Sequence, residues 1–200
     1  MKKKALLLTL SAAALVAASV FGTYAYLTDT EAVTNTFTVG QVGITLDEAP
    51  VDKDGKETTG ERVIANEYHL LPGHEYDKDP TVHVDKDSED CYVFVKVENG
   101  ISAIEAQDNT SAQQIEDNDW KKLSDVENVY YKKWEKGNGL DLVVFKKFKI
   151  DGKVDNATIA KYASKDANGK DTGVNIKVTA YAVQADGFAT ALEAWNTALK

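Results

Sequence analysis

Apolar and polar residues alternate along several short stretches of the chain, and this period of two is typical of half-buried β-strands. The strongest case is CYVFVKVE at 91–98, where Cys91 and three valines share one face and the other face grades from aromatic to charged. The stretch VNIKVTAYAV at 174–183 alternates in the same way. We therefore expect two long strands, the first with its valine face in a core and its other face half exposed.

Shorter alternating stretches predict further strands between turn signals. Residues 33–46 alternate on both sides of Gly40, which indicates two strands separated by a bulge or a tight turn. The dipeptide Asp54-Gly55 is typical of a hairpin turn. The other predicted strands are 81–84, 129–133 and 140–150.

The C-terminal residues follow a helical period instead. Four apolar residues recur at i, i+4, i+7 and i+11, so they form one stripe on a helix, and Asp186 is its expected cap. Shorter helices are expected at 111–115, where a loop is the alternative, and at 154–164. The residues of the C-terminal stripe are Phe188, Leu192, Trp195 and Leu199.

The order of these elements predicts the fold class. Strands separated by turns, with helices inserted late and at the end, favour a mainly β fold. We expect an antiparallel β-sandwich with short inserted helices and a C-terminal amphipathic helix. The chain has 200 residues, of which 43% are hydrophobic, and this length and composition suit one domain.

The N-terminus has the layout of a secretory signal. Three lysines at 2–4 precede an uncharged apolar run at 5–21. Counted on to Leu27, the run reaches about 23 residues, which is long enough to span a bilayer of roughly 30 Å as a helix. Length alone therefore leaves a signal peptide and a membrane anchor both open.

Small residues near the end of the run favour cleavage. Thr23 and Ala25 stand three and one positions before a candidate cut, so we predict that Tyr26 becomes the mature N-terminus. The predicted organisation is a signal peptide at 1–25 and a single domain at 26–200. The membrane is then a partner only before cleavage, and the processed protein is secreted.

The charge and the cysteine content narrow the possible partners. The formal net charge is −9, and removal of the N-terminal lysines makes the remainder more acidic. An acidic surface repels polyanions, so we expect neither nucleic acid nor anionic lipid as a partner. Cys91 is the only cysteine, which excludes an intramolecular disulfide.

The candidate metal ligands are the three histidines, His69, His74 and His83. Three imidazoles can form an open zinc site. Their spacing does not give the His-Glu-x-x-His helix of the zinc proteases. The alternative interpretation is three histidines in turns and at strand edges.

Two acidic stretches, 52–57 and 85–90, resemble part of a calcium loop. Counted from Asp85, however, the sixth position is Asp90 and the twelfth is Lys96, where a calcium loop needs glycine and glutamate. Solvated acidic turns are the alternative. Cys91 lies inside a predicted strand, and neither a Gly-x-Ser-x-Gly turn nor a phosphate loop occurs. The sequence therefore contains no constellation that requires an enzyme or a cofactor.

Short motifs at both ends and in the middle of the chain carry a family resemblance. They are Thr23-Tyr24-Ala25 at the predicted cut, Thr36-Phe37-x-x-Gly40-x-Val42-x-Ile44, the Leu-Leu-Pro-Gly turn at 70–73 with Lys78-Asp79-Pro80 after it, and VTAYAVQADGF at 178–188. Together with the lysine-rich leader, these motifs resemble the TasA/camelysin family. Its members are secreted by Gram-positive bacteria through a dedicated signal peptidase of the SipW type.

The resemblance implies a jelly-roll-like β-sandwich, and the best-known members of the family assemble into extracellular fibres of the biofilm matrix. In that assembly the N-terminal segment of one subunit completes a sheet of the next, so the partner is a second copy of the chain. Carried onto this sequence, the donor strand is about 26–37. On one face it has the apolar residues Leu27, Val33 and Phe37, and between them Asp29, Glu31 and Asn35.

Two alternative functions stay open. Some members of the family are described as metallo-endopeptidases, and such an activity would require zinc. The third possibility is a monomeric binding or adhesive module of the cell surface. Neither alternative excludes a role for calcium at the acidic turns.

Overall fold

The computed structural model describes residues 28–31, 42–162 and 174–199. The predicted signal peptide and its cleavage site at Thr23, Ala25 and Tyr26 lie outside these ranges, and so do Leu27, Val33 and Phe37. Within the described ranges, no helix has the length and the apolar character needed to cross a membrane.

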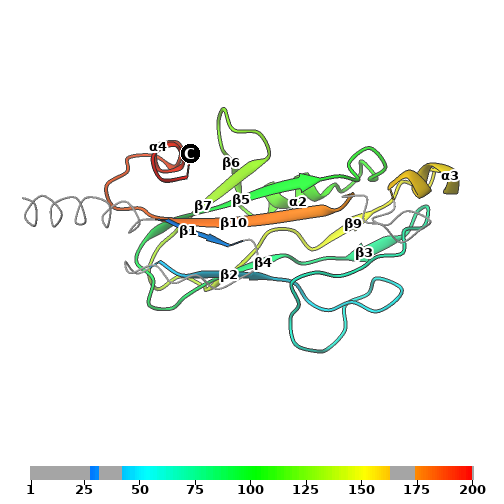
Figure 1. Cartoon of the computed structure of the whole chain (residues 1–200), viewed down its shortest axis with the longest axis horizontal. Coiled ribbons are helices and arrows are strands. Elements are labelled where there is room, and N and C mark those ends of the chain that lie inside the picture. Colours follow the sequence, from blue (N-terminus) through cyan, green and yellow to red (C-terminus); the bar gives the residue numbers. More distant parts are fainter. Residues whose placement is uncertain (1–27, 32–41, 163–173, 200) are drawn as a thin grey trace, which may run out of the picture.

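The described residues form a mainly β structure of antiparallel sheets, as the sequence predicts (Figure 1). The largest sheet has five strands in the order β1-β10-β5-β7-β6, and the next has three in the order β2-β4-β8. The strands of the first are β1 (Thr28–Glu31), β10 (Ile176–Gln184), β5 (Cys91–Asn99), β7 (Val129–Trp134) and β6 (Lys121–Lys122). The strands of the second are β2 (Ile44–Asp47), β4 (Thr81–Val84) and β8 (Asp141–Val143).

The main core lies between these two sheets. Val93 and Val95 of β5 are fully buried in it and belong to the same cluster as Ile44 of β2 and Val82 of β4. Ala180 of β10 belongs to it as well. The predicted valine face of β5 is therefore confirmed as a core face.

The outer face of the five-stranded sheet is covered by α4 (Ala191–Ala198) (Figure 1). The Trp195 ring meets Phe94 of β5 edge-on at 5.2 Å between ring centroids and Tyr181 of β10 at 5.4 Å. The expectation that this face of β5 is half exposed is confirmed, because Tyr92 and Phe94 are buried in the cluster that includes α4, whereas Lys96 is partly exposed and Glu98 is exposed.

The amphipathic C-terminal helix is confirmed, but its start is not where the sequence places it. The backbone N–H of Glu193 donates to the Thr190 hydroxyl at 3.1 Å, so Thr190 caps the helix. Asp186 lies four residues earlier and is not the cap. A threonine oxygen can accept the free N–H of the first turn as well as an aspartate can.

A two-stranded sheet of β3 (Glu75–Asp77) and β9 (Lys147–Lys149) encloses a further cluster at one end of the molecule. The short helices α2 (Ser111–Asp117) and α3 (Asn156–Ile159) are confirmed, and α3 continues into a 3₁₀ turn, η1 (Ala160–Tyr162). The prediction of a single strand at 140–150 is wrong, because this stretch forms two short strands in two different sheets. Of these, β8 pairs with β4, and β9 pairs with β3. Val144 and Phe145 between them are both fully buried, which breaks the alternation.

We predict that Trp195→Ala lowers the free energy of unfolding by roughly 3 kcal/mol, because it leaves a cavity between α4 and the aromatic face of the sheet. Chemical denaturation measures this change. Asn196→Ala, one residue further on and exposed, is the matched control and should change stability by less than about 0.5 kcal/mol. Equal losses in the two variants would show that α4 does not cover a core face.

Candidate functional site

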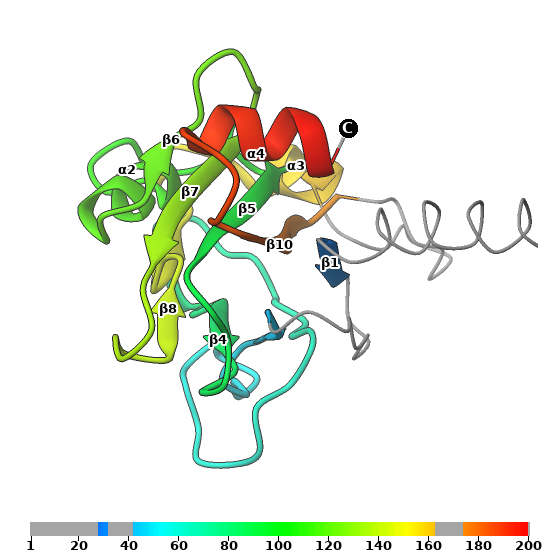
Figure 2. The same cartoon turned by 90° about the vertical axis from the view of Figure 1, so that its left-hand side faces the viewer.

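The candidate site is the edge of the five-stranded sheet at β10. On its inner side, β10 pairs with β5 over its whole length of nine residues, from Ile176 to Gln184. On its outer side, it pairs only with the four residues of β1, with Thr28 opposite Val183 and Glu31 opposite Ala180. Figure 2 shows β1 beside β10.

The remaining half of this edge, Ile176–Thr179, pairs with no strand among the described residues. The burial of β10 changes at the same point. Ala180 and Ala182 are fully buried where β1 covers the edge, whereas Ile176 and Val178, on the same face, are only partly buried. The apolar side chains of β10 beyond the end of β1 are therefore less deeply buried than those beside it.

A cavity of about 260 Å³ lies along this half of the edge. It is lined by Ile176 and Val178 of β10, by Glu48 at the end of β2, and by Ile64 and Lys78. The Ile64 side chain is 67% exposed, which is unusual for a large apolar residue. We call this cavity the edge groove.

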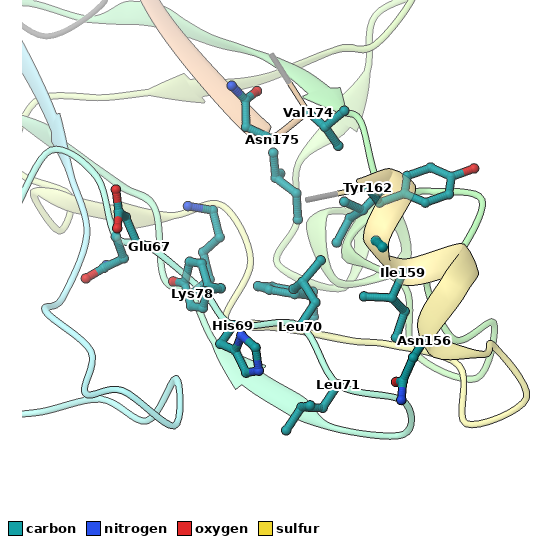
Figure 3. A pocket seen from close by; sticks show the side chains of 16 residues that line it. Glu67, His69, Leu70, Leu71, Lys78, Asn156, Ile159, Tyr162, Val174 and Asn175 are labelled. Atoms are coloured by element: carbon teal, nitrogen blue, oxygen red, sulfur yellow. The ribbon is translucent and has the colours of Figure 1, made fainter. Parts of the chain in front are cut away.

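A larger cavity of about 710 Å³ adjoins the edge groove and shares Asn66, Lys78, Asn175 and Ile176 with it. Figure 3 shows Leu70 and Leu71 along one side of the larger cavity and Ile159 and Tyr162, from α3 and η1, along another. Phe148 also lines it, so its wall is largely apolar. The two cavities therefore meet at Ile176, where β10 begins.

The polar floor of the edge groove is a buried ion pair. The Lys78 ammonium lies 2.5 Å from Oε2 of Glu48, and both side chains are largely buried. The other carboxylate oxygen, Glu48 Oε1, is buried and has no hydrogen-bond partner. A buried acceptor without a donor costs roughly 1–3 kcal/mol, so native proteins keep few of them.

The wall opposite β10 is held in place by side chains that bond to the backbone. Asn66 donates to the Ala49 carbonyl at 2.8 Å and accepts from the Val51 N–H at 3.0 Å. Arg62 bridges the carboxylates of Asp47 and Asp79. These bonds tie the segment that carries Ile64 to the end of β2, so the groove has a firm wall.

The three candidate histidines lie apart. His83 on β4 bonds to Asp141 at 2.7 Å and to Asp47 at 2.9 Å. His74 lies 3.3 Å from the Asp54 carbonyl, and His69 lines the larger cavity. Within the described ranges, no three histidine, cysteine, aspartate or glutamate side chains are grouped so that they could hold a metal ion.

The acidic turns bond mainly to themselves and their neighbours. Asp52 accepts the backbone N–H groups of Asp54 and Lys56, both at 2.9 Å, and these bonds lower the pKa of Asp52. Asp90 accepts the Lys136 N–H in the same manner. Cys91 is fully buried, and burial raises the pKa of its thiol to about 12, so it has no thiolate character at neutral pH.

In comparisons with known proteins, no family model, no curated protein and no solved structure matches this chain.

The groove residues give only weak signals in the sequence. Lys78 is part of the Lys-Asp-Pro motif, but nothing in its spacing indicates an ion pair with a residue thirty positions earlier. Ile64 lies in a short apolar run with Val63 and Ala65, so the sequence does not mark it as an exposed side chain. Pairing of β1 with β10 has no local signal, since it joins residues from opposite ends of the chain.

The His83 bonds predict a pH-dependent contribution to stability. Partial burial lowers the pKa of His83, but its bonds to Asp141 and Asp47 outweigh burial and raise it above 6.5. Folding therefore favours the charged form, and this stabilisation is complete below about pH 6.5 and disappears as the pH rises through the folded-state pKa.

We expect His83→Ala to lower the free energy of unfolding more at pH 5.5 than at pH 8.5. The difference should be roughly 0.5–1 kcal/mol, because Asp141 is largely exposed and the interaction is screened. Denaturant titration at the two pH values measures it. His69→Ala, at an exposed position away from Asp47 and Asp141, is the control. An equal loss at both pH values would contradict a charged His83.

Proposed function

We propose that this chain is a secreted structural protein of the extracellular matrix of a Gram-positive bacterium and that it assembles into fibres by N-terminal strand donation. The observation that supports the proposal is the pairing of β1 with the edge of β10. The resemblance to the TasA/camelysin family suggests the same function, and a jelly-roll-like arrangement of the two main sheets.

The position of β1 in the chain makes it a suitable donor. It begins at Thr28, two residues after the predicted mature N-terminus at Tyr26. A strand at the end of a chain can leave its own sheet and enter the same place in a neighbour without any other element having to move. The bonds lost and gained are then alike, which is why exchange of identical elements is a low-cost route to assembly.

The acceptor side is equally suitable. When β1 leaves, β10 becomes an edge strand of nine residues with its backbone groups unpaired on one side. An incoming strand would satisfy these groups and cover Ala180 and Ala182, whose side chains line the core. Each subunit would carry one donor and one acceptor, so head-to-tail addition leads to an open fibre.

Cleavage would control the process. Before cleavage, the donor is joined directly to the apolar leader and remains at the membrane. Removal of 1–25 would free the N-terminus of the donor, so assembly would begin only after export. The signal peptidase is therefore a partner during export and the second copy is the partner afterwards.

The alternatives draw less support from the described residues. A zinc endopeptidase would need ligands brought together, and His69, His74 and His83 lie apart. A monomeric binding module could use the larger cavity. Electron microscopy of the processed protein distinguishes this alternative from fibre formation.

We predict that mature protein lacking 26–37 stays monomeric under conditions in which the mature chain forms fibres, because it can accept a strand but cannot donate one. Sedimentation and electron microscopy measure the difference. Fibres that form equally well without 26–37 would contradict strand donation.

A mixing experiment controls for misfolding of the shortened chain. If its β10 edge is intact, a small fraction of the shortened protein should bind to growing ends and shorten the fibres of the mature chain. A misfolded chain would leave fibre length unchanged.

A further inference from the structure

We infer that Asn138 is a site of spontaneous covalent modification, at which the side-chain amide is converted through a cyclic imide into aspartate and isoaspartate. Asn138 and Gly139 lie in the turn that joins β7 to β8 (Figure 2). The reaction requires only water and the folded chain, so it does not depend on the proposed function.

The nucleophile is the backbone nitrogen of the residue that follows the asparagine. The Gly139 nitrogen loses its proton and bonds to Cγ of Asn138, the bond from Cγ to Nδ2 breaks, and ammonia leaves with that proton. Water then adds to either carbonyl of the resulting succinimide. Opening of the ring at Cγ gives aspartate, whereas opening at the main-chain carbonyl gives isoaspartate. Glycine favours the attack because it has no Cβ next to the nucleophile.

The sequence contains three Asn-Gly pairs, at 99–100, 138–139 and 168–169. The third lies outside the described residues, but the first two can be compared. Their local sequence chemistry is the same, so any difference in reactivity between them comes from the fold.

The pair at 99–100 is protected by hydrogen bonds. The Asn99 side chain donates from Nδ2 to Glu105 at 2.9 Å and accepts the backbone N–H of Ile101 at 3.0 Å. The Gly100 N–H donates to the Asn175 carbonyl at 2.8 Å. Both reacting groups are therefore held in place, and attack on Cγ requires at least two of these bonds to break.

The pair at 138–139 has no such protection. The turn is closed by the backbone N–H of Asn138, which donates to the Glu135 carbonyl at 3.0 Å, and Gly137 supplies the positive φ of 96° that the turn requires. In the part of the chain that the structure describes, neither the Asn138 side chain nor the Gly139 N–H makes a hydrogen bond. Both residues are exposed, so the nucleophile and the amide are free to meet.

Isoaspartate at this position would disturb the core, because the turn is anchored on both sides. The Trp134 indole N–H donates to the Gly139 carbonyl at 2.9 Å, and Trp134 is buried in the main core. The Leu140 carbonyl accepts the backbone N–H of Val84 on β4 at 2.8 Å. Isoaspartate inserts an extra methylene group into the main chain between these anchors. The Gly139 carbonyl then moves away from the indole, which leaves a buried donor without its partner.

The test is to keep the folded wild-type protein at pH 8.5 and to follow each Asn-Gly pair by peptide mapping and mass spectrometry. We expect Asn138 to change from amide to acid at least about tenfold faster than Asn99, because at least two hydrogen bonds must break at Asn99. In denaturant the two rates should converge. Equal rates in the folded protein, or an absence of isoaspartate at position 138, would overturn the inference.

Gly139→Ala is the matched control variant. A Cβ at this position meets no atom within 4 Å, so the variant should fold like the wild type. The added methyl group hinders attack by its own backbone nitrogen, and the modification of Asn138 should slow severalfold. Unchanged formation of isoaspartate in a stable Gly139→Ala variant would contradict attack by this nitrogen.

Asn138→Asp separates the effect of charge from the effect of the longer main chain. This variant carries the new carboxylate but no extra methylene group, so its denaturant midpoint and its tryptophan fluorescence should match those of fresh wild-type protein. The isoaspartate form should unfold at a lower denaturant concentration. Equal midpoints for the isoaspartate form and the fresh protein would overturn the predicted loss of the Trp134 bond.

Discussion

The structure depends on the need to pair both edges of β10. This strand contributes to each of the three apolar clusters, through Ala182 between the sheets, Val183 under α4, and Ile176 near the β3 and β9 pair. Unpaired backbone groups next to apolar side chains invite association with other chains, so the pairing of both edges of such a strand matters. β5 covers one edge completely, whereas β1 covers less than half of the other.

The part of β10 that β1 does not pair with lies beside an ion pair in which one carboxylate oxygen has no hydrogen-bond partner. Lys78 satisfies one oxygen of Glu48 and also lies 5.7 Å from the centre of the Tyr68 ring, where the aromatic face stabilises its charge. The second oxygen of Glu48 has no such partner. Buried charged pairs stabilise a protein only when their remaining hydrogen-bonding capacity is used. The second oxygen of Glu48 therefore belongs to a residue that lines the same cavity as the part of β10 beyond β1.

The sequence predicts the elements of this structure better than their arrangement. Alternation identifies β5 and β10, and the stripe that includes Trp195 identifies α4, because local burial on one face leaves a local period. The same reasoning fails at Val144 and Phe145, where the chain passes between sheets and both neighbours are buried. It also does not identify what covers the aromatic half of the outer face of β5, since Phe94 contacts a helix about a hundred residues later in the chain.

The candidate site is less predictable than the fold for the same reason. The donor segment can be proposed from its place after the cleavage site and from the family resemblance, but its partner strand, its register and Glu48 depend on contacts between distant parts of the chain. No local pattern indicates that one oxygen of a buried glutamate lacks a donor. That information exists only once β2, β10 and the segment around Ile64 are brought together.

A short β1 suits both states of the proposed assembly. In the single subunit it covers the part of the β10 edge beside Ala180 and Ala182, which are both fully buried. A strand of four paired residues can open locally at low cost, because few contacts have to break. In the proposed fibre, the exchanged strand would make the same four pairs with the neighbouring subunit, so exchange would not require a new interface at this edge.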